Sequence, residues 1–141
     1  MLMTAITLHN IPEGMAVGLA FALSGGADGL TAAAALALGI GVQNVPEGAA
    51  VSLPLRRMGM SRGRAFSMGV LSGAVEPLFG MLAVMAVSGI SRIMPWLLSF
   101  AAGAMLYVVV CELIPAADDR RGLFWYIAGF LLMMILDVAL G

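Results

Sequence analysis

The sequence predicts an all-α integral membrane protein with five transmembrane helices. Its 141 residues are 62% hydrophobic and only 11% charged, and a water-soluble domain of this length could not bury that much apolar surface. Breaker residues and charges also divide the chain into five apolar segments, each long enough to cross a bilayer as a helix. A single transmembrane domain over residues 1–141 is therefore expected.

The predicted helices follow one another with short connections between them. In chain order they cover residues 2–23, 30–54, 65–89, 96–117 and 123–140. Three glycines lie in the first connection, Ser24–Gly29, and four arginines lie in the second, Leu55–Arg64. The third connection, Gly89–Pro95, ends in a proline that suits the start of a helix. The fourth, Asp118–Gly122, carries four charged residues.

Glycines spaced four residues apart predict where helices pack closely. The pairs are Gly14 with Gly18 and Gly69 with Gly73. Such residues lie on one helix face and let a neighbouring backbone approach. Ordinary packing is the expected role, and a direct role in a transport pathway is the alternative.

The placement of the arginines predicts the orientation in the membrane. Six of the seven arginines lie in the second and fourth connections, and Arg92 lies on the other side. The positive-inside bias therefore places these connections and the N-terminus in the cytoplasm, and the C-terminus outside. A multi-pass protein of the cell (inner) membrane is expected. The net charge of −1 offers no basic face, so nucleic acid is not an expected partner.

A six-residue motif occurs twice within the apolar part of the chain. Residues 9–14 read HNIPEG, and residues 43–48 read QNVPEG. Each copy places an imidazole or amide, a second amide and a carboxylate close together on one helix. These side chains are His9, Asn10 and Glu13 in the first copy, and Gln43, Asn44 and Glu47 in the second. Such nitrogen and oxygen donors suit Zn²⁺, Fe²⁺, Mn²⁺ or Cd²⁺.

Three carboxylates fall at a similar depth on three predicted helices. They belong to Glu13, Glu47 and Glu76. A charged residue at the bilayer centre costs roughly 2.5–3.5 kcal/mol, so three unpaired ones would cost about 8–10 kcal/mol. No lysine or arginine lies at that depth. The carboxylates are therefore expected to be protonated or to be held together by a bound cation.

A proline accompanies each of these acids. Pro12, Pro46 and Pro77 lack a backbone donor, so a carbonyl in each helix is expected to lose its partner. Free carbonyls are tolerated at membrane depth where they face protein or a polar cavity. We therefore expect a water-accessible cavity at the midplane, with kinking for packing as the alternative. Because successive helices run antiparallel, the two motifs can face each other about a pseudo-two-fold axis.

These motifs resemble those of the ZIP (zinc-regulated, iron-regulated transporter-like) metal transporters, and more specifically their prokaryotic branch. HNIPEG, QNVPEG and the third-helix motif SGAVEP at residues 72–77 carry the resemblance. Residues 104–107 with 112–115 look like the family's seventh helix, and residues 129–137 look like its eighth. The resemblance implies an eight-helix bundle, of which this chain supplies the last five helices, with a pseudo-symmetric helix pair carrying the metal site.

The resemblance also implies a binuclear metal centre. One site would use His9, Glu13, Gln43 and Glu47. The other would use Asn10, Glu13, Asn44, Glu47 and Glu76, with Glu13 and Glu47 bridging the two ions. Glu112 would be an exit-side ligand near the cytoplasmic mouth, and Cys111 beside it could assist, with a small buried thiol as the alternative.

The function implied is transport of divalent transition metal ions, most of all zinc, into the cytoplasm. The metal would be the transported substrate rather than a cofactor, and no enzyme is expected because the chain contains no HExxH motif. The alternative is a truncated, non-transporting metal-binding or regulatory membrane protein, since three helices of the family are missing here. The expected partners are divalent metal ions, the lipid bilayer, and a second copy of the chain or the missing N-terminal helices.

Overall fold

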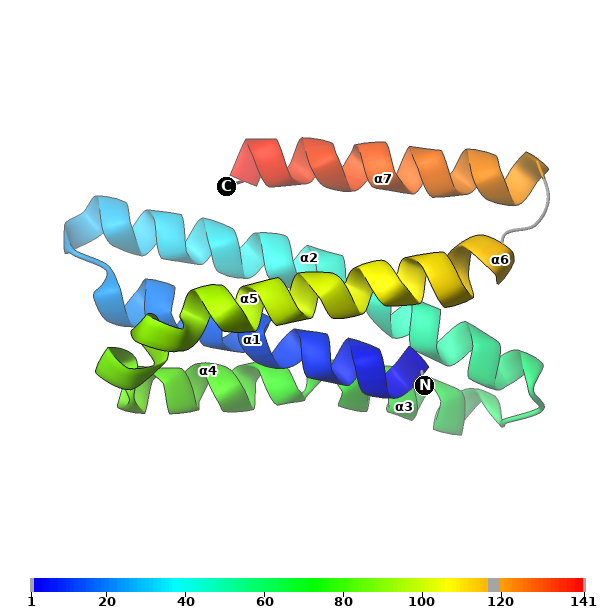
Figure 1. The fold of residues 1–141 in the computed structure, drawn as a ribbon, viewed down its shortest axis with the longest axis horizontal. Helices are drawn as coiled ribbons and strands as arrows, with labels where there is room; N and C mark the ends of the chain where they lie inside the picture. Colours follow the sequence, from blue (N-terminus) through cyan, green and yellow to red (C-terminus); the bar gives the residue numbers. More distant parts are fainter. Residues whose placement is uncertain (1, 117–119, 141) are drawn as a thin grey trace.

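The computed structural model describes residues 2–116 and 120–140, apart from the side chains of a few residues, among them that of Glu112. The helices are α1 (Leu2–Leu23), α2 (Gly26–Arg57), α3 (Arg62–Gly73), α4 (Val75–Met85), α5 (Val87–Val108), the π-helix η1 (Val109–Leu113), α6 (Ile114–Ala116) and α7 (Arg120–Leu140). Only Ala74 separates α3 from α4, and α5, η1 and α6 continue one another. The described part of the chain therefore forms five rods and contains no strand (Figure 1). This confirms the all-α fold class.

The connections differ from the predicted ones, most of all at the first and the third. Residues 24 and 25 alone separate α1 from α2, because Gly26 adopts a φ of 71°, a left-handed conformation that favours glycine. The segment predicted as the third connection, residues 89–95, is helical and belongs to α5. Met94 in this segment is buried against Leu19 of α1. Packing on α1 therefore outweighs the local glycine and proline signals.

Several helices are suited to a membrane. Three segments are long and apolar enough to cross one, namely Gly26–Arg57, Arg62–Met85 and Val87–Cys111. Residues 121–135 form a shorter apolar helix within the described part of the chain. The 22-residue α1 carries the polar residues of the first motif at its middle. Together these elements indicate a multi-pass membrane protein.

Helix α1 lies at the centre of the bundle (Figure 1). It packs against α2, α3, α4 and α5, and most extensively against α4. The third rod changes partner at its break, because α3 packs mainly on α2 whereas α4 packs on α1. α7 lies at the edge of the bundle and packs against α2. The second rod (α2), the broken third rod (α3 and α4) and α5 thus all pack around α1.

Glycines allow the backbones of α1 and α4 to touch. A Cβ atom on Gly14 would overlap the backbone of Glu76, and one on Gly18 would overlap that of Gly80. Both contacts join residues 62 positions apart, so the two helices run parallel. Gly69 makes a similar close contact with α2, whereas the fourth glycine singled out by spacing, Gly73, faces open space.

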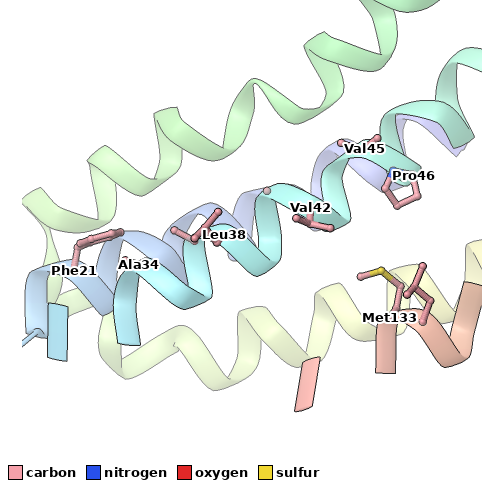
Figure 2. Close-up of a pocket in the computed structure, with 10 residues that line it drawn as sticks. Phe21, Ala34, Leu38, Val42, Val45, Pro46 and Met133 are labelled. Atoms are coloured by element: carbon pink, nitrogen blue, oxygen red, sulfur yellow. The ribbon is translucent and has the colours of Figure 1, made fainter. Parts of the chain in front are cut away.

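An apolar groove lies between α2 and α7 (Figure 2). It has a volume of about 790 Å³ and is lined by residues of α1, α2 and α7. Leu38, Val42 and Pro46 line it from α2, and Met133 lines it from α7. Its lining offers no charged side chain. Pro46 faces this groove while its neighbour Glu47 is buried elsewhere, so the polar residues of the second motif lie on a different face of α2.

Candidate metal centre

The two copies of the motif meet where α1 and α2 pack together. His9, Glu13 and Glu47 each offer one ligand atom, and these atoms all lie within 4.8 Å of one another. Nε2 of His9 lies 3.2 Å from Oε1 of Glu13. Spacing of i and i+4 explains this pair, because both side chains lie on one face of α1. Glu47 reaches the same point from α2.

Gln43 joins the two carboxylates of this group. Its Nε2 donates hydrogen bonds to Oε1 of Glu13 and to Oε1 of Glu47, each 2.8 Å long. One bond remains within α2 and the other crosses to α1. We refer to His9, Glu13, Gln43 and Glu47 as the first cluster.

A backbone carbonyl of α5 orients the imidazole. Nδ1 of His9 lies 3.3 Å from the carbonyl oxygen of Ala101. A carbonyl can only accept, so Nδ1 carries the proton of this contact. The other ring nitrogen, Nε2, then faces Glu13. This arrangement is common for metal-binding histidines, whose second nitrogen is fixed by an outer partner.

In the part of the chain that the structure describes, five oxygen atoms of the two motifs and of Glu76 are buried without a hydrogen-bond partner. They are Oδ1 of Asn10, Oε2 of Glu13, Oδ1 of Asn44, Oε2 of Glu47 and Oε1 of Glu76. We call the groups that carry them the second cluster. Buried acceptors without donors are costly, and a cation can supply the missing interactions. Their oxygen-only donor set differs from the mixed set of the first cluster.

The other atoms of the second cluster are held in place. Nδ2 of Asn10 donates to the backbone oxygen of Ser72 at 2.9 Å, and Nδ2 of Asn44 donates to Oε2 of Glu76 at 2.6 Å. Asn10 is 1% exposed and Glu76 is 8% exposed. With each amide nitrogen engaged, the amide oxygens remain available as ligands. The two asparagines are therefore oriented by different partners, although they occupy matching positions in the two motifs.

Glu13 and Glu47 contribute to both clusters. Oε1 of each accepts from Gln43 in the first cluster. Oε2 of each is an unpartnered atom of the second cluster. Each carboxylate therefore has one oxygen in the first cluster and one in the second.

The three prolines affect their helices differently. α1 and α2 continue as helices through Pro12 and Pro46, whereas the third rod breaks at Ala74, close to Pro77. A pocket of about 450 Å³ lies between α1, α2 and α4 and reaches Glu76. The rest of its lining is glycine, proline and apolar residues. Pro77 therefore opens its helix, but this pocket is mainly apolar.

The expected exit-side residues lie on the π-helix η1. Cys111 is exposed, which differs from the buried-thiol alternative, and it is not part of the group formed by His9, Glu13 and Glu47. The side chain of Glu112 lies outside the described residues. The irregular turn has a local cause, because Pro115 has no N–H for the carbonyl of Cys111. Ile114 instead bonds to the oxygen of Val109.

Sequence reasoning missed two residues that support the clusters. Ser72 is 1% exposed, and its carbonyl holds Asn10. Ala101 holds His9 in the same way. Both act through the backbone, so their residue types gave little signal. Ser72 opens the motif SGAVEP one turn before Glu76, and this position was the clue to its place.

Fold and clusters together define a multi-pass helical membrane protein whose candidate metal ligands lie at the contact of two helices. The chain matches the ZIP zinc transporter family over residues 1–137. It belongs to that family. This confirms the resemblance carried by the three motifs.

Named relatives come from animals and bacteria. The zinc transporter ZIP11 of Xenopus tropicalis is 50% identical over 147 residues, covering 100% of this chain and 44% of that protein. The zinc transporter GufA of Myxococcus xanthus is 46% identical over 144 residues, covering 97% and 54%. The zinc transporter ZIPB of Bordetella bronchiseptica is 42% identical over 140 residues, covering 96% and 44%. The chain thus spans about half the length of the curated relatives it matches.

Proposed function

We propose that this protein transports divalent transition metal ions, zinc first among them, into the cytoplasm through a binuclear centre between α1 and α2. The observation that carries the proposal is the set of five unpartnered buried oxygens next to the first cluster. Such a set is costly in a membrane unless a cation completes it. The names of the relatives support zinc as the cargo.

Each cluster would hold one ion. The first ion would bind His9, Glu13, Gln43 and Glu47. The second would bind Asn10, Glu13, Asn44, Glu47 and Glu76. The shared carboxylates would bridge the ions, and mixed nitrogen and oxygen ligands suit zinc at the first site. The substrate would be the metal itself, and no catalytic residue is proposed.

The direction of transport is proposed from the charges at the ends of the helices. The connection between α2 and α3 is flanked by four exposed arginines: Arg56, Arg57, Arg62 and Arg64. The positive-inside bias supports a cytoplasmic position for this connection and for the start of α1, and an outer position for the end of α7. Ions leaving toward the cytoplasm would pass Cys111 and Glu112. The proposed location is the cell (inner) membrane.

A second candidate is a metal-binding or regulatory membrane protein that does not transport. It is favoured by the open apolar groove beside α7. Both candidates would bind metal at the same centre, but only the first would carry metal ions across the membrane.

Glu47→Ala is expected to abolish zinc uptake, because it removes a ligand of both ions. The chain, and the same motif in a full-length relative, would be reconstituted in vesicles that contain a zinc-sensitive dye. Asp28→Ala is the matched control, since Asp28 is an exposed acid at the start of the same helix. Its uptake should equal that of the wild type.

The outcomes separate the candidates. Zinc binding without flux by the wild-type chain would support the second candidate. Undiminished uptake by Glu47→Ala would rule out the proposed centre. Absence of zinc binding by the wild type would contradict both candidates.

A further inference from the structure

Gln43 occupies an unusual position for a metal ligand. Its amide nitrogen lies 2.8 Å from Oε1 of Glu13 and 2.8 Å from Oε1 of Glu47. Carboxylate oxygens accept hydrogen bonds, so the NH₂ end of the amide, and not its oxygen, must lie between them. A ligand role requires the opposite orientation, because an amide binds a metal through its oxygen.

The two N–H groups hold together carboxylates that would otherwise repel each other. α1 contains no lysine or arginine, and α2 carries arginine only at its last two residues. Glu47 is 8% exposed, so water screens this pair poorly. Two charge-assisted hydrogen bonds from one neutral group offset the repulsion without adding a charge.

The matching residue of the first motif could not act in this way. His9 has two ring nitrogens, and Nδ1 is engaged by the carbonyl of Ala101. One nitrogen remains, and it pairs with Glu13 at 3.2 Å. Gln43, with two protons on one nitrogen, can bond to both acids at once. The departure from exact repetition of the motif, glutamine in place of histidine, therefore has a physical consequence.

We propose that Gln43 is a displaceable stand-in for the first metal ion. In the absence of metal its NH₂ group holds Glu13 and Glu47 together. An entering ion takes the place of the nitrogen between the two Oε1 atoms, and the amide turns to present its oxygen as a ligand. Each entering ion must then break two hydrogen bonds to bind. This inference rests on the proposed metal centre.

The sequence allows a direct test on the wild-type chain. Gln43 is its one glutamine and His9 its one histidine, so ¹⁵N labelling of these residue types gives one assigned side chain of each. In metal-free protein the two Gln43 amide protons should resonate downfield and exchange slowly, as hydrogen-bonded protons do. Addition of Zn²⁺ should move both upfield and speed their exchange, while the ¹⁵N signals of His9 shift on binding.

The two labels distinguish failure of the stand-in role of Gln43 from failure of the proposed metal site. If the His9 signals respond to Zn²⁺ but the Gln43 protons show no loss of hydrogen bonding, the stand-in role is overturned and the metal site is retained. If neither label responds, the proposed metal site itself fails. A response of both as described supports the inference.

A variant adds a kinetic test. Gln43→Leu can neither donate to the acids nor bind metal, so it should associate with Zn²⁺ at least about tenfold faster than the wild type in stopped-flow measurements. Loss of a ligand alone would speed dissociation and leave association unchanged. Thr31→Leu, an exposed polar position on the same helix, is the control and should keep the wild-type rate. An association rate equal to that of the wild type would contradict the proposal.

Discussion

Replacing Gly14 with alanine is expected to weaken zinc binding at the second cluster at least about tenfold, whereas the same change at Gly48 should leave it nearly unaltered. A Cβ atom on Gly14 would overlap the backbone of Glu76, which cannot move aside without shifting the helix. Overpacking of this kind costs about 1–3 kcal/mol and would displace Glu76 from its partners. At Gly48 the added atom would lie 3.5 Å from the oxygen of Gly69, an ordinary contact.

Binding and unfolding measurements check this contrast. Zinc affinity would be measured by calorimetry in detergent micelles, and stability by thermal unfolding of the same samples. Gly48→Ala is the matched control, since it occupies the same position in the second copy of the motif. Equal behaviour of the two variants would show that the contact between α1 and α4 does not position Glu76.

Exchanging Glu13 for glutamine is expected to remove both metal ions, whereas the same exchange at Glu76 should remove one. Oε1 of Glu13 lies in the first cluster and its Oε2 in the second, so both ions would lose a negative ligand. Glu76 contributes to the second cluster alone. Loss of outer-shell partners already weakens metal sites by about 10–100-fold, and loss of a charged ligand should exceed this.

The measurement is the number of ions bound. Equilibrium dialysis against Zn²⁺ followed by elemental analysis should give a ratio near two for the wild type, one for Glu76→Gln and zero for Glu13→Gln. ¹¹³Cd spectra of the same proteins would show which of two signals is lost. A Glu13→Gln variant that keeps one tightly bound ion would contradict the bridging role.

Local spacing accounts for the parts of the centre that the sequence predicts well. His9 with Glu13 and Gln43 with Glu47 are each separated by four residues, so helix geometry alone aligns them. The meeting of the two motifs also follows from successive antiparallel helices, and the structure brings them within hydrogen-bonding distance. Their roles as ligands remain predictions.

Long-range packing decides the features that local signals miss. The helical course of residues 89–95 depends on Met94 packing against α1. The hydrogen bond from Asn10 to the carbonyl of Ser72 depends on how α1 and α3 are placed relative to each other, which no single segment of the sequence determines. The donor orientation of Gln43 depends on two acids, one of them on another helix. Each of these features requires the assembled bundle.

The parallel contact between α1 and α4 has a consequence for how the protein is made. Its partners lie 62 residues apart in the chain, at Gly14 and Glu76 and again at Gly18 and Gly80. At ribosomal speeds of about 5–20 residues per second, synthesis of that stretch takes roughly 3–12 s. During this interval the first helix, with a histidine, an asparagine and a glutamate at its middle, has been made but its main partner has not. Until the third rod is made, α1 lacks the close backbone contacts at Gly14 and Gly18, so the glycines that shape the finished centre join α1 to a partner that is synthesised late.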